Sequence, residues 1–265
     1  MPLSVLNSFN SGDAITFLAG LRGVYEKEGL KSNFYQRLHF PAFYYEGATH
    51  PITDRENKPV TMNEKQWSML QPLIEKQPYI NLASEWKGEE IDLSFDETRD
   101  RRLLNMPYGN IHFWAFLVHS RLQTDLSRAW IEAETVSGFK DMVVINRTQR
   151  YQNPYVSYYF LKPYENNIIF AGTETEHKVF CETWNINIPL LQPKDFYELA
   201  CVIKSCRFFL GNQSMCWHIA DAMKKERILE FSPDFPNTFP TGDKGKIFLY
   251  QHSLEQQFVE LYDRN

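Results

Sequence analysis

Three short turns in the second half of the sequence contain the residues best suited to bind an anion. Each turn lies where an apolar run of strand length ends. The turns contain Arg147 and Arg150, then Gly172 and Thr173, and finally Gly211, Asn212, Gln213 and Ser214. A guanidinium group pairs with two phosphate oxygens at once, and glycine before a helix lets backbone N–H groups approach a ligand closely. The predicted chemistry is the binding of a diphosphate, and the alternatives are ordinary surface arginines and a well-capped helix without a ligand.

An alternation of strand and helix patterns must position these turns. Apolar runs of strand length alternate with amphipathic runs of helix length, which is typical of βαβ units on a parallel sheet. The predicted strands are 142–146, 167–172, 186–191, 207–211, 227–231 and 246–250, and the predicted helices are 174–184, 195–205, 214–225 and 254–262. In such sheets ligands bind at the carboxyl ends of strands, against helix N-termini. We therefore expect an α/β protein with its site at that edge.

The first half of the sequence shows the same alternation and one further candidate residue. The predicted strands are 3–9, 33–38 and 79–83, and the predicted helices are 13–28, 64–76 and 108–120. Asp13 opens the first helix, where aspartate is typical of an N-cap. Because Asp13 also follows the first strand, it is a candidate carboxylate facing a central cleft. The two interpretations are compatible.

Two other polar segments of the first half have structural interpretations. Thr61 and Glu64 resemble a capping box before the second helix. The segment 85–102 is strongly charged. A solvated, salt-bridged surface explains this segment better than a metal site does.

Length and composition limit the class of protein. The 265 residues suffice for two small α/β domains or one large domain, and the composition changes softly between residues 130 and 140. No run reaches membrane-spanning length and no secretory pattern opens the chain, so we expect a cytoplasmic protein. The formal net charge of −5 gives no field that would attract nucleic acid by itself. The four cysteines form no CxxC pair, so we expect buried free thiols.

Several catalytic signatures are absent from the sequence. It contains no GxxxxGK[ST], GxGxxG, GxSxG or HExxH, which argues against a P-loop nucleotidase, a dehydrogenase, a serine hydrolase and a zinc peptidase. His177 and Cys181 lie four residues apart on a predicted helix, where core packing explains them better than a metal does. The turns at the strand ends are the candidate functional residues that remain.

Three segments resemble signatures of the ADP-heptose:lipopolysaccharide heptosyltransferases, glycosyltransferase family 9. Residues 11–22 are similar to the N-terminal signature, with Gly12-Asp13 and Leu21-Arg22 matching and Gly20 departing from it. Residues 170–177 resemble the family's strand-to-helix turn. Residues 209–220 resemble its nucleotide-phosphate turn, in which Asn212 replaces an aspartate while His218 and Ala220 match. Each motif is short, so their order and separation along the chain support the resemblance more strongly than any single motif does.

The resemblance implies the GT-B architecture, which has two Rossmann-like domains with the active site between them. We expect an acceptor-side domain at residues 1–135 and a nucleotide-sugar-binding domain at residues 136–265. Because the chain is short for the family, the N-terminal domain should be reduced.

The resemblance also implies roles for individual residues. Asp13 would be the general base that takes the proton of an acceptor hydroxyl as its oxygen attacks the anomeric carbon with inversion. Fixed donors would stabilise the charge that develops on the leaving diphosphate. The implied donor site contains Arg147, Arg150, Gly172, Thr173, Glu176, Gly211, Asn212, Gln213, Ser214 and His218. The scheme requires no metal and no cofactor, since the nucleoside-diphosphate sugar is a co-substrate.

The implied function is therefore an inverting, metal-independent glycosyltransferase that moves a hexosyl or pentosyl group. Its acceptor is a glycan, a protein, a small glycoside or a modified nucleobase. Two alternatives stay open: a non-catalytic module that binds a sugar nucleotide or a glycan, and a sugar-nucleotide epimerase. The presence of Asn212 in place of aspartate and the reduced N-terminal domain favour the module among these alternatives.

Overall fold

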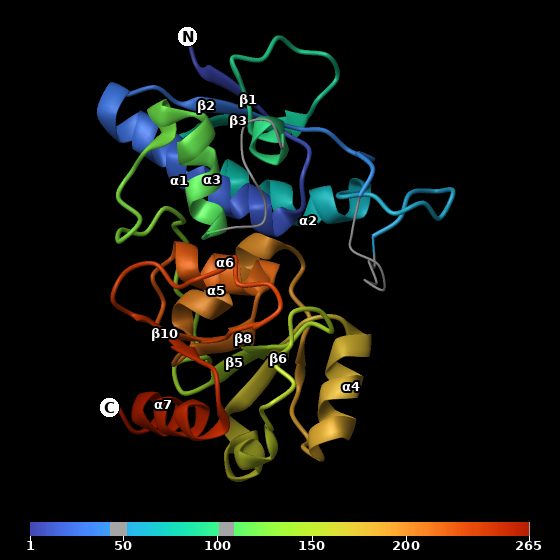
Figure 1. Ribbon diagram of the computed structural model, residues 1–265, viewed down its shortest axis with the longest axis vertical. Helices are drawn as coiled ribbons and strands as arrows, with labels where there is room; N and C mark the ends of the chain where they lie inside the picture. The colour runs from blue at the N-terminus through green and yellow to red at the C-terminus, as the bar shows by residue number, and fades with distance from the viewer. Residues whose placement is uncertain (43–51, 101–108, 265) are drawn as a thin grey trace. The chain divides into compact units, whose positions relative to one another are not determined.

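The computed structural model describes residues 1–42, 52–100 and 109–264, and the chain forms two compact units (Figure 1). Unit 1 contains Met1–Leu126, Trp130–Glu132 and Lys194–Tyr197. Unit 2 contains Ser127–Ala129, Ala133–Pro193 and Glu198–Asn265. Each unit has its own parallel sheet, so the fold class is α/β, as predicted. The assignment of an acceptor to the first domain and a nucleotide sugar to the second stays a prediction.

Unit 1 is built around a four-stranded parallel sheet in the order β3-β2-β1-β4. Strand β1 pairs with β2 on one side and with β4 on the other, so the order of the strands reverses between β1 and β4. The strands are β1 (Leu3–Asn7), β2 (Ser32–Gln36), β3 (Ile80–Glu85) and β4 (Leu93–Ser94), and the helices are α1 (Ser11–Glu28), α2 (Glu64–Glu75) and α3 (Ile111–Val118), with the 3₁₀ helices η1 (Phe95–Arg99) and η2 (Ser120–Leu122).

Stacked aromatic rings and one glycine fix the helices of unit 1. Phe17 of α1 stacks on Phe95 of η1, with ring centroids 4.8 Å apart. A Cβ atom on Gly20 would lie 2.8 Å from the Cβ atom of Leu122, which is closer than real Cβ contacts allow. Glycine therefore lets η2 approach α1, and this contact accounts for the departure of Gly20 from the heptosyltransferase signature.

Unit 2 is built around a six-stranded parallel sheet in the order β10-β9-β8-β5-β6-β7. The chain runs outward from β5 through β6 to β7, and then crosses to β8 and runs outward to β10. The strands are β5 (Val143–Asn146), β6 (Ile168–Ala171), β7 (Leu190–Leu191), β8 (Phe209–Asn212), β9 (Arg227–Glu230) and β10 (Gly245–Phe248), and the helices are α4 (Glu174–Trp184), α5 (Phe196–Ser205), α6 (Met215–Ala222) and α7 (Gln251–Asp263), with the 3₁₀ helix η3 (Tyr159–Asn167).

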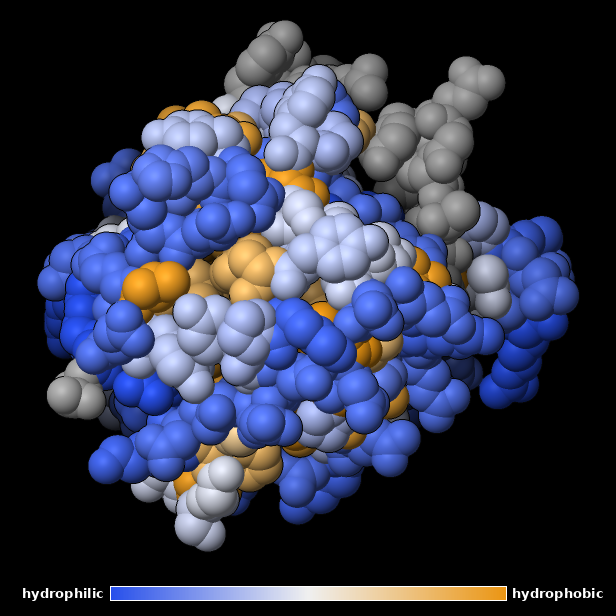
Figure 2. Space-filling view, turned by 90° about the horizontal axis from the view of Figure 1, so that it is seen from below, coloured by the Kyte–Doolittle hydropathy of each residue, from blue (hydrophilic) through white to orange (hydrophobic). Residues whose placement is uncertain are grey.

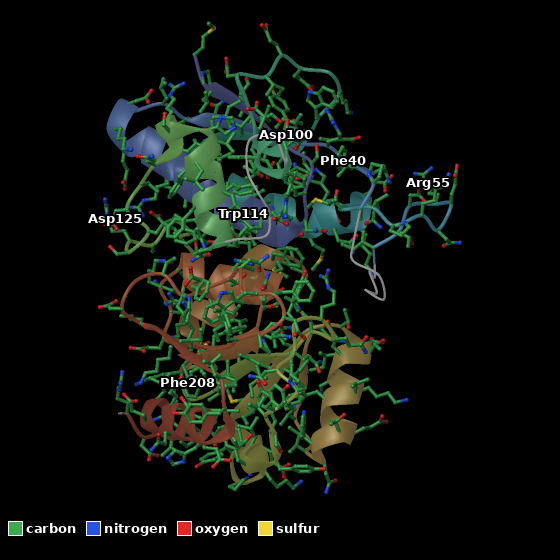
Figure 3. All side chains as sticks on the ribbon, in the orientation of Figure 1. Phe40, Arg55, Asp100, Trp114, Asp125 and Phe208 are labelled. Atoms are coloured by element: carbon green, nitrogen blue, oxygen red, sulfur yellow. The ribbon has the colours of Figure 1, made fainter. Side chains whose placement is uncertain are left out.

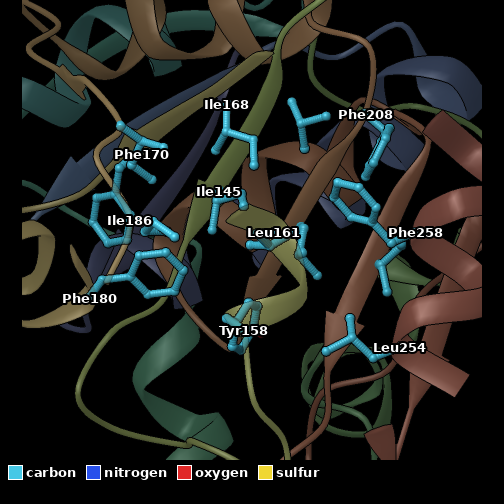
Figure 4. Packing of buried hydrophobic residues seen from close by; sticks show 14 of the residues in the cluster. Ile145, Tyr158, Leu161, Ile168, Phe170, Phe180, Ile186, Phe208, Leu254 and Phe258 are labelled. Atoms are coloured by element: carbon cyan, nitrogen blue, oxygen red, sulfur yellow. The ribbon is translucent and has the colours of Figure 1, made fainter. Parts of the chain in front are cut away.

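Helices cover both faces of the sheet of unit 2 (Figure 1). On one face, side chains of α4, α7 and η3 pack on the strands in a single hydrophobic cluster, drawn in Figure 4. Helices α5 and α6 cover the other face with a second set of buried apolar side chains. A sheet that is buried on both faces explains the nearly continuous apolar strands of this half of the sequence.

Two sequence-predicted helix caps are wrong. Helix α1 begins at Ser11 with Asn10 at its N-cap position, so Asp13 lies in the first turn of the helix. The N-cap of α2 is Asn63, whose side chain accepts a hydrogen bond of 3.2 Å from the backbone N–H of Gln66. The proposed capping box of Thr61 with Glu64 therefore does not form, and the Thr61 hydroxyl donates to the carbonyl oxygen of Ser8 instead.

The charged segment 85–102 is less exposed than the sequence predicted. It contains β4 and η1, and the side chains of Leu93, Phe95 and Thr98 are buried. The expectation of a solvated surface is therefore wrong for these three residues, whereas Asp96, Glu97 and Arg99 keep some exposure and form ion pairs. Residues 101 and 102, and residue 108 at the start of the predicted helix 108–120, lie outside the described residues.

Three of the four cysteines are buried, and Cys181 is partly buried. Hydrophilic residues predominate on the face seen in Figure 2, and the hydrophobic residues visible there lie in small groups. No described helix combines the length and apolarity that a membrane crossing requires. All four cysteines are free, as predicted. Burial raises the pKa of Cys206 to about 11 and that of Cys216 to about 12, so neither thiol is a nucleophile near neutral pH.

Candidate functional site

The switch point of the sheet in unit 2 lies between β5 and β8. Asn146 at the end of β5 is paired with Gly211 of β8. In open α/β sheets, ligands bind in the crevice outside the carboxyl ends of the strands at such a point. The predicted turns after β5 and β8 therefore lie together at the edge where a ligand is expected.

The turn after β8 is shaped for close approach of the backbone. A Cβ atom on Gly211 would lie 2.5 Å from the carbonyl oxygen of Asn146, so no larger residue fits there. Ser214 caps α6 by accepting a hydrogen bond of 3.1 Å from the backbone N–H of Trp217. The N-terminus of α6, with its partial positive charge, thus points toward the carboxyl edge beside Gln213. His218 is buried in the same helix.

The side chain of Asn212 holds the loop that follows β5. Its Oδ1 atom accepts a hydrogen bond of 2.9 Å from the N–H of Thr148, and its Nδ2 atom donates to the carbonyl oxygens of Thr148 and Arg150 at 3.0 and 2.6 Å. Asn212 is fully buried. Its amide is therefore occupied by the protein itself, and it positions the loop rather than contacting a donor.

Arg147 has a structural partner inside unit 2. Its Nε and Nη2 atoms donate to the two carboxylate oxygens of Glu230 at 2.8 and 2.9 Å, and Glu230 also accepts from the hydroxyl of Tyr158 and the N–H of Asn153. Burial opposes ionisation of the guanidinium, but the hydrogen bonds to Glu230 raise the pKa of Arg147. This arrangement argues against the predicted phosphate role, because the bidentate edge of Arg147 is already filled.

Arg150 is the second predicted cation, and it is only partly buried. Its guanidinium lies over the ring of Tyr151 at 5.3 Å, and Tyr151 has a left-handed backbone with φ of 57°. The carbonyl oxygen of Arg150 is fixed by Asn212. Asn212 thus fixes the backbone position from which the Arg150 side chain extends.

The turn after β6 forms a capping box. The Thr173 hydroxyl accepts from the N–H of Glu176, while the Glu176 carboxylate accepts from the N–H of Thr173 at 2.9 Å. Gly172 and Thr173 are exposed at the N-terminus of α4. His177 contacts the carbonyl oxygen of Ile188 and the Sγ atom of Cys181. Among the described residues, no three potential ligands could hold a metal ion.

Unit 1 has its own switch point, between β1 and β4, and Asp13 lies there. The Asp13 carboxylate accepts a hydrogen bond from Nη2 of Arg99 through Oδ1, and only 9% of the side chain is exposed. The guanidinium of Arg99 lies over the rings of Phe9 and Trp114, at 5.0 and 4.8 Å. Asp13 lies on helix α1 and Arg99 on η1. The two residues are 86 positions apart in the sequence, so the pair forms only when these elements pack together.

A second pair of charges lies at the same edge of unit 1. Asp96 accepts hydrogen bonds from the N–H and the hydroxyl of Ser8, at 2.9 and 2.7 Å. Burial raises the pKa of Asp96, against the lowering effect of the hydrogen bond from the Ser8 hydroxyl and the charge of Arg37. Sequence reasoning missed Arg37, Asp96 and Arg99. The available signal was that Arg37 and Trp86 directly follow β2 and β3.

Two parallel sheets, each with a switch point at its carboxyl edge, define a protein of two Rossmann-like domains, the GT-B class. Solved structures of glycosyltransferase family 9 share this fold over nearly the whole chain. No protein-family model matches the sequence, and no curated protein matches it.

Three of these structures illustrate the likeness. The glycosyltransferase of family 9 from Veillonella parvula has 12% identity and a TM-score of 0.60, over 98% of this chain and 88% of its own. The ADP-heptose lipopolysaccharide heptosyltransferase II of E. coli has 12% identity and a TM-score of 0.60, over 99% and 98%. The E. coli heptosyltransferase WaaC, solved with ADP, has 10% identity and a TM-score of 0.58, over 98% and 100%. The predicted fold is therefore confirmed.

Proposed function

We propose that this protein is an inverting glycosyltransferase that moves a sugar from a nucleoside-diphosphate sugar to an acceptor hydroxyl without a metal ion. The observation that carries the proposal is the switch point of unit 2. There a glycine-lined turn, a capped helix N-terminus and a loop held by Asn212 meet in a fold that glycosyltransferases share. A solved structure of this fold contains ADP, which supports a nucleotide ligand.

The donor's diphosphate would bind at the N-terminus of α6. Backbone N–H groups around Gln213 and Ser214, together with the guanidinium of Arg150, would neutralise the charge that grows on the leaving diphosphate. The exposed turn of Gly172 and Thr173 would approach the nucleoside. Arg147 and Asn212 are left out of the contacting set, because their polar groups bind Glu230 and the loop after β5.

Asp13 is the proposed general base of unit 1. No described residue hydrogen-bonds its Oδ2 atom, while Oδ1 accepts from Arg99. Oδ2 would take the proton of the acceptor hydroxyl as that oxygen attacks the anomeric carbon. Arg99 would hold the carboxylate in one orientation during that transfer.

Thermal stability in the presence of nucleotides tests the donor site. A ligand that binds only the folded chain stabilises it by about 2.7 kcal/mol at a hundred times its dissociation constant. We expect one of ADP, GDP, UDP, CDP or TDP, or one of their sugars, to raise the melting temperature. A flat response across the whole panel would contradict the proposal.

Arg150→Ala should weaken binding of the responding nucleotide by about tenfold or more, since hydrogen bonds to charged groups contribute about 1.5–3 kcal/mol. Lys178→Ala is the matched control, because Lys178 is an exposed cation of unit 2 on α4. The measurement is the dissociation constant by calorimetry. Equal affinity of Arg150→Ala and wild type would reject the phosphate role of Arg150.

Asp13→Asn should retain nucleotide affinity and lose at least about 100-fold in turnover, because general base catalysis contributes roughly 10²–10⁴-fold. The measurement is the release of nucleoside diphosphate from the sugar nucleotide that responds in the panel. Turnover near wild type would show that Asp13 is not the base.

The contact of Arg99 with Asp13 also favours a second candidate, a module of the same fold that binds a sugar nucleotide without turnover. In that case wild type and Asp13→Asn would bind the nucleotide equally, and neither would release nucleoside diphosphate. Measurable turnover by wild type excludes the module.

A further inference from the structure

Arg37 of unit 1 lies over two aromatic rings at the carboxyl edge of the sheet. It directly follows β2, and its guanidinium carbon lies 4.4 Å from the centroid of the Trp86 ring and 5.8 Å from that of Phe40. Trp86 directly follows β3, and its indole N–H donates to the carbonyl oxygen of Glu89 at 3.1 Å, which fixes the ring. The two rings pack against the guanidinium, so its edge is the part best placed to meet a ligand.

The edge of Arg37 makes no hydrogen bond with the described part of the chain. No described residue accepts a hydrogen bond from its side chain, and its Nε atom is buried without a partner. Among the described residues Asp96 forms an ion pair with Arg37, at 3.7 Å from Nη1, which is too long for a hydrogen bond. Both oxygens of Asp96 already accept from Ser8. Since 32% of the Arg37 side chain is exposed while Nε is buried, the exposure belongs to its other atoms.

Arg99 is a second arginine that lies over aromatic rings, and its guanidinium edge binds a carboxylate. Its guanidinium also lies over two rings, those of Phe9 and Trp114, and its edge donates to the carboxylate of Asp13. The rings of Phe9 and Phe40 are in edge contact at 6.5 Å. The two arginines thus belong to one row in unit 1, in which Phe40 and Trp114 can be found in Figure 3. The row runs Trp114, Arg99, Phe9, Phe40, Arg37, Trp86.

We propose that Arg37 is an oxyanion subsite, which binds a carboxylate or phosphate group of the acceptor through the edge of its guanidinium. A planar guanidinium donates two parallel hydrogen bonds to such a group. The ring stacking fixes its plane in advance, so little side-chain freedom is lost on binding. The inference deepens the proposed function, because it takes the ligand to be the acceptor.

Matched pairs of sugars test the site on the full chain. Glucuronate is compared with glucose, glucose 6-phosphate with glucose, and inorganic phosphate is measured alone, each by calorimetry. We expect at least one anionic probe to bind about tenfold or more tightly than glucose. A preference for glucuronate identifies a carboxylate as the group, and a preference for glucose 6-phosphate or inorganic phosphate identifies a phosphate.

Substitutions assign the effect to Arg37. Arg37→Gln should abolish the preference for the anion, and Arg37→Lys should lose most of it, because a lysine ammonium lacks the planar fork. Arg121→Gln is the control, since Arg121 is another partly exposed arginine of unit 1, paired with Glu28. An equal affinity for charged and neutral sugars in wild type, or an unchanged preference in both Arg37 variants, would overturn the inference.

The nucleotide panel on the same samples separates this inference from the proposed function. Nucleotide binding by wild type and by both Arg37 variants, with the anion preference lost only in the variants, supports both proposals. Anion binding through Arg37 without any nucleotide response leaves the subsite standing and contradicts the glycosyltransferase. Nucleotide binding without an anion preference overturns the subsite alone.

Discussion

The two switch points of this molecule have the same topology and opposite chemistry. At the carboxyl edge of unit 2, the polar side chains of Arg147 and Asn212 are paired with the protein's own groups. At the carboxyl edge of unit 1, Arg37 and Asp13 keep polar atoms to which no described residue hydrogen-bonds. A ligand at unit 2 would meet mainly backbone N–H groups, with Arg150 as the one proposed charged contact, whereas a ligand at unit 1 would meet the charged side chains of Arg37 and Asp13.

This difference indicates how the two edges would respond to mutation. In unit 2, where the side chains hold the loops, a substitution should mainly lower the stability of the fold and weaken ligand binding as a consequence. Where the side chains point to a ligand, substitution damages binding or turnover and leaves stability nearly unchanged. The three predictions that follow test this contrast.

Arg147→Met should give the largest effect, a loss of about 3–5 kcal/mol of stability, because it leaves the carboxylate of Glu230 buried without its partner. The measurement is the melting temperature of the full chain. Adding Glu230→Gln should recover part of the loss, since that change removes the unpaired charge. Normal melting with lost nucleotide binding would break the contrast and restore the phosphate role of Arg147.

Asn212→Asp should cost about 1–3 kcal/mol of stability and should also weaken nucleotide binding. The amide donates to two carbonyl oxygens, and an aspartate would place negative charge against both of them. Asn185→Asp adds the same charge at the exposed C-cap of α4 and serves as the control. Melting curves and nucleotide affinities of the two variants are compared. If the two variants behave alike, Asn212 does not position the loop.

Asp96→Asn should give the smallest effect, and that effect should depend on pH. Because the folded pKa of Asp96 is raised, its stabilising contribution is complete below the unfolded pKa near 3.8 and is lost as pH rises through the folded value. The melting temperature of wild type relative to Asp96→Asn should therefore fall as pH rises through this window. Asp234→Asn, at an exposed carboxyl group of unit 2, provides the comparison. A difference that grows with pH would contradict the assignment.

The hydrophobic pattern was enough to predict most elements of unit 2. Helix α4 was predicted at 174–184 and forms at Glu174–Trp184, because a capping threonine and an apolar stripe mark its limits. The turns after β5, β6 and β8 were placed at the correct edge for the same reason. Strand β4 was missed because its two residues lie in a segment of mostly charged side chains, and with it the switch point of unit 1 was missed.

The pairings of the polar side chains were beyond the sequence. Arg147 and Glu230 are 83 residues apart, and neither residue has a local pattern that names the other. In the sequence, Asn212 is a departure from a phosphate-binding motif. Its three hydrogen bonds to the loop depend on the pairing of strand β5 with β8, which the sequence does not show.

The grouping of Lys194–Tyr197 with unit 1 has a consequence for how the chain is made. The ring of Tyr197 lies 5.6 Å from the ammonium group of Lys76, the C-cap residue of α2. Unit 1 is therefore incomplete when a ribosome has synthesised the first 132 residues, and it gains its last segment only after β5, β6 and α4 have emerged. The first domain of the sequence is therefore finished only when much of the second has been made, and a fragment that ends at residue 135 would lack part of its own surface.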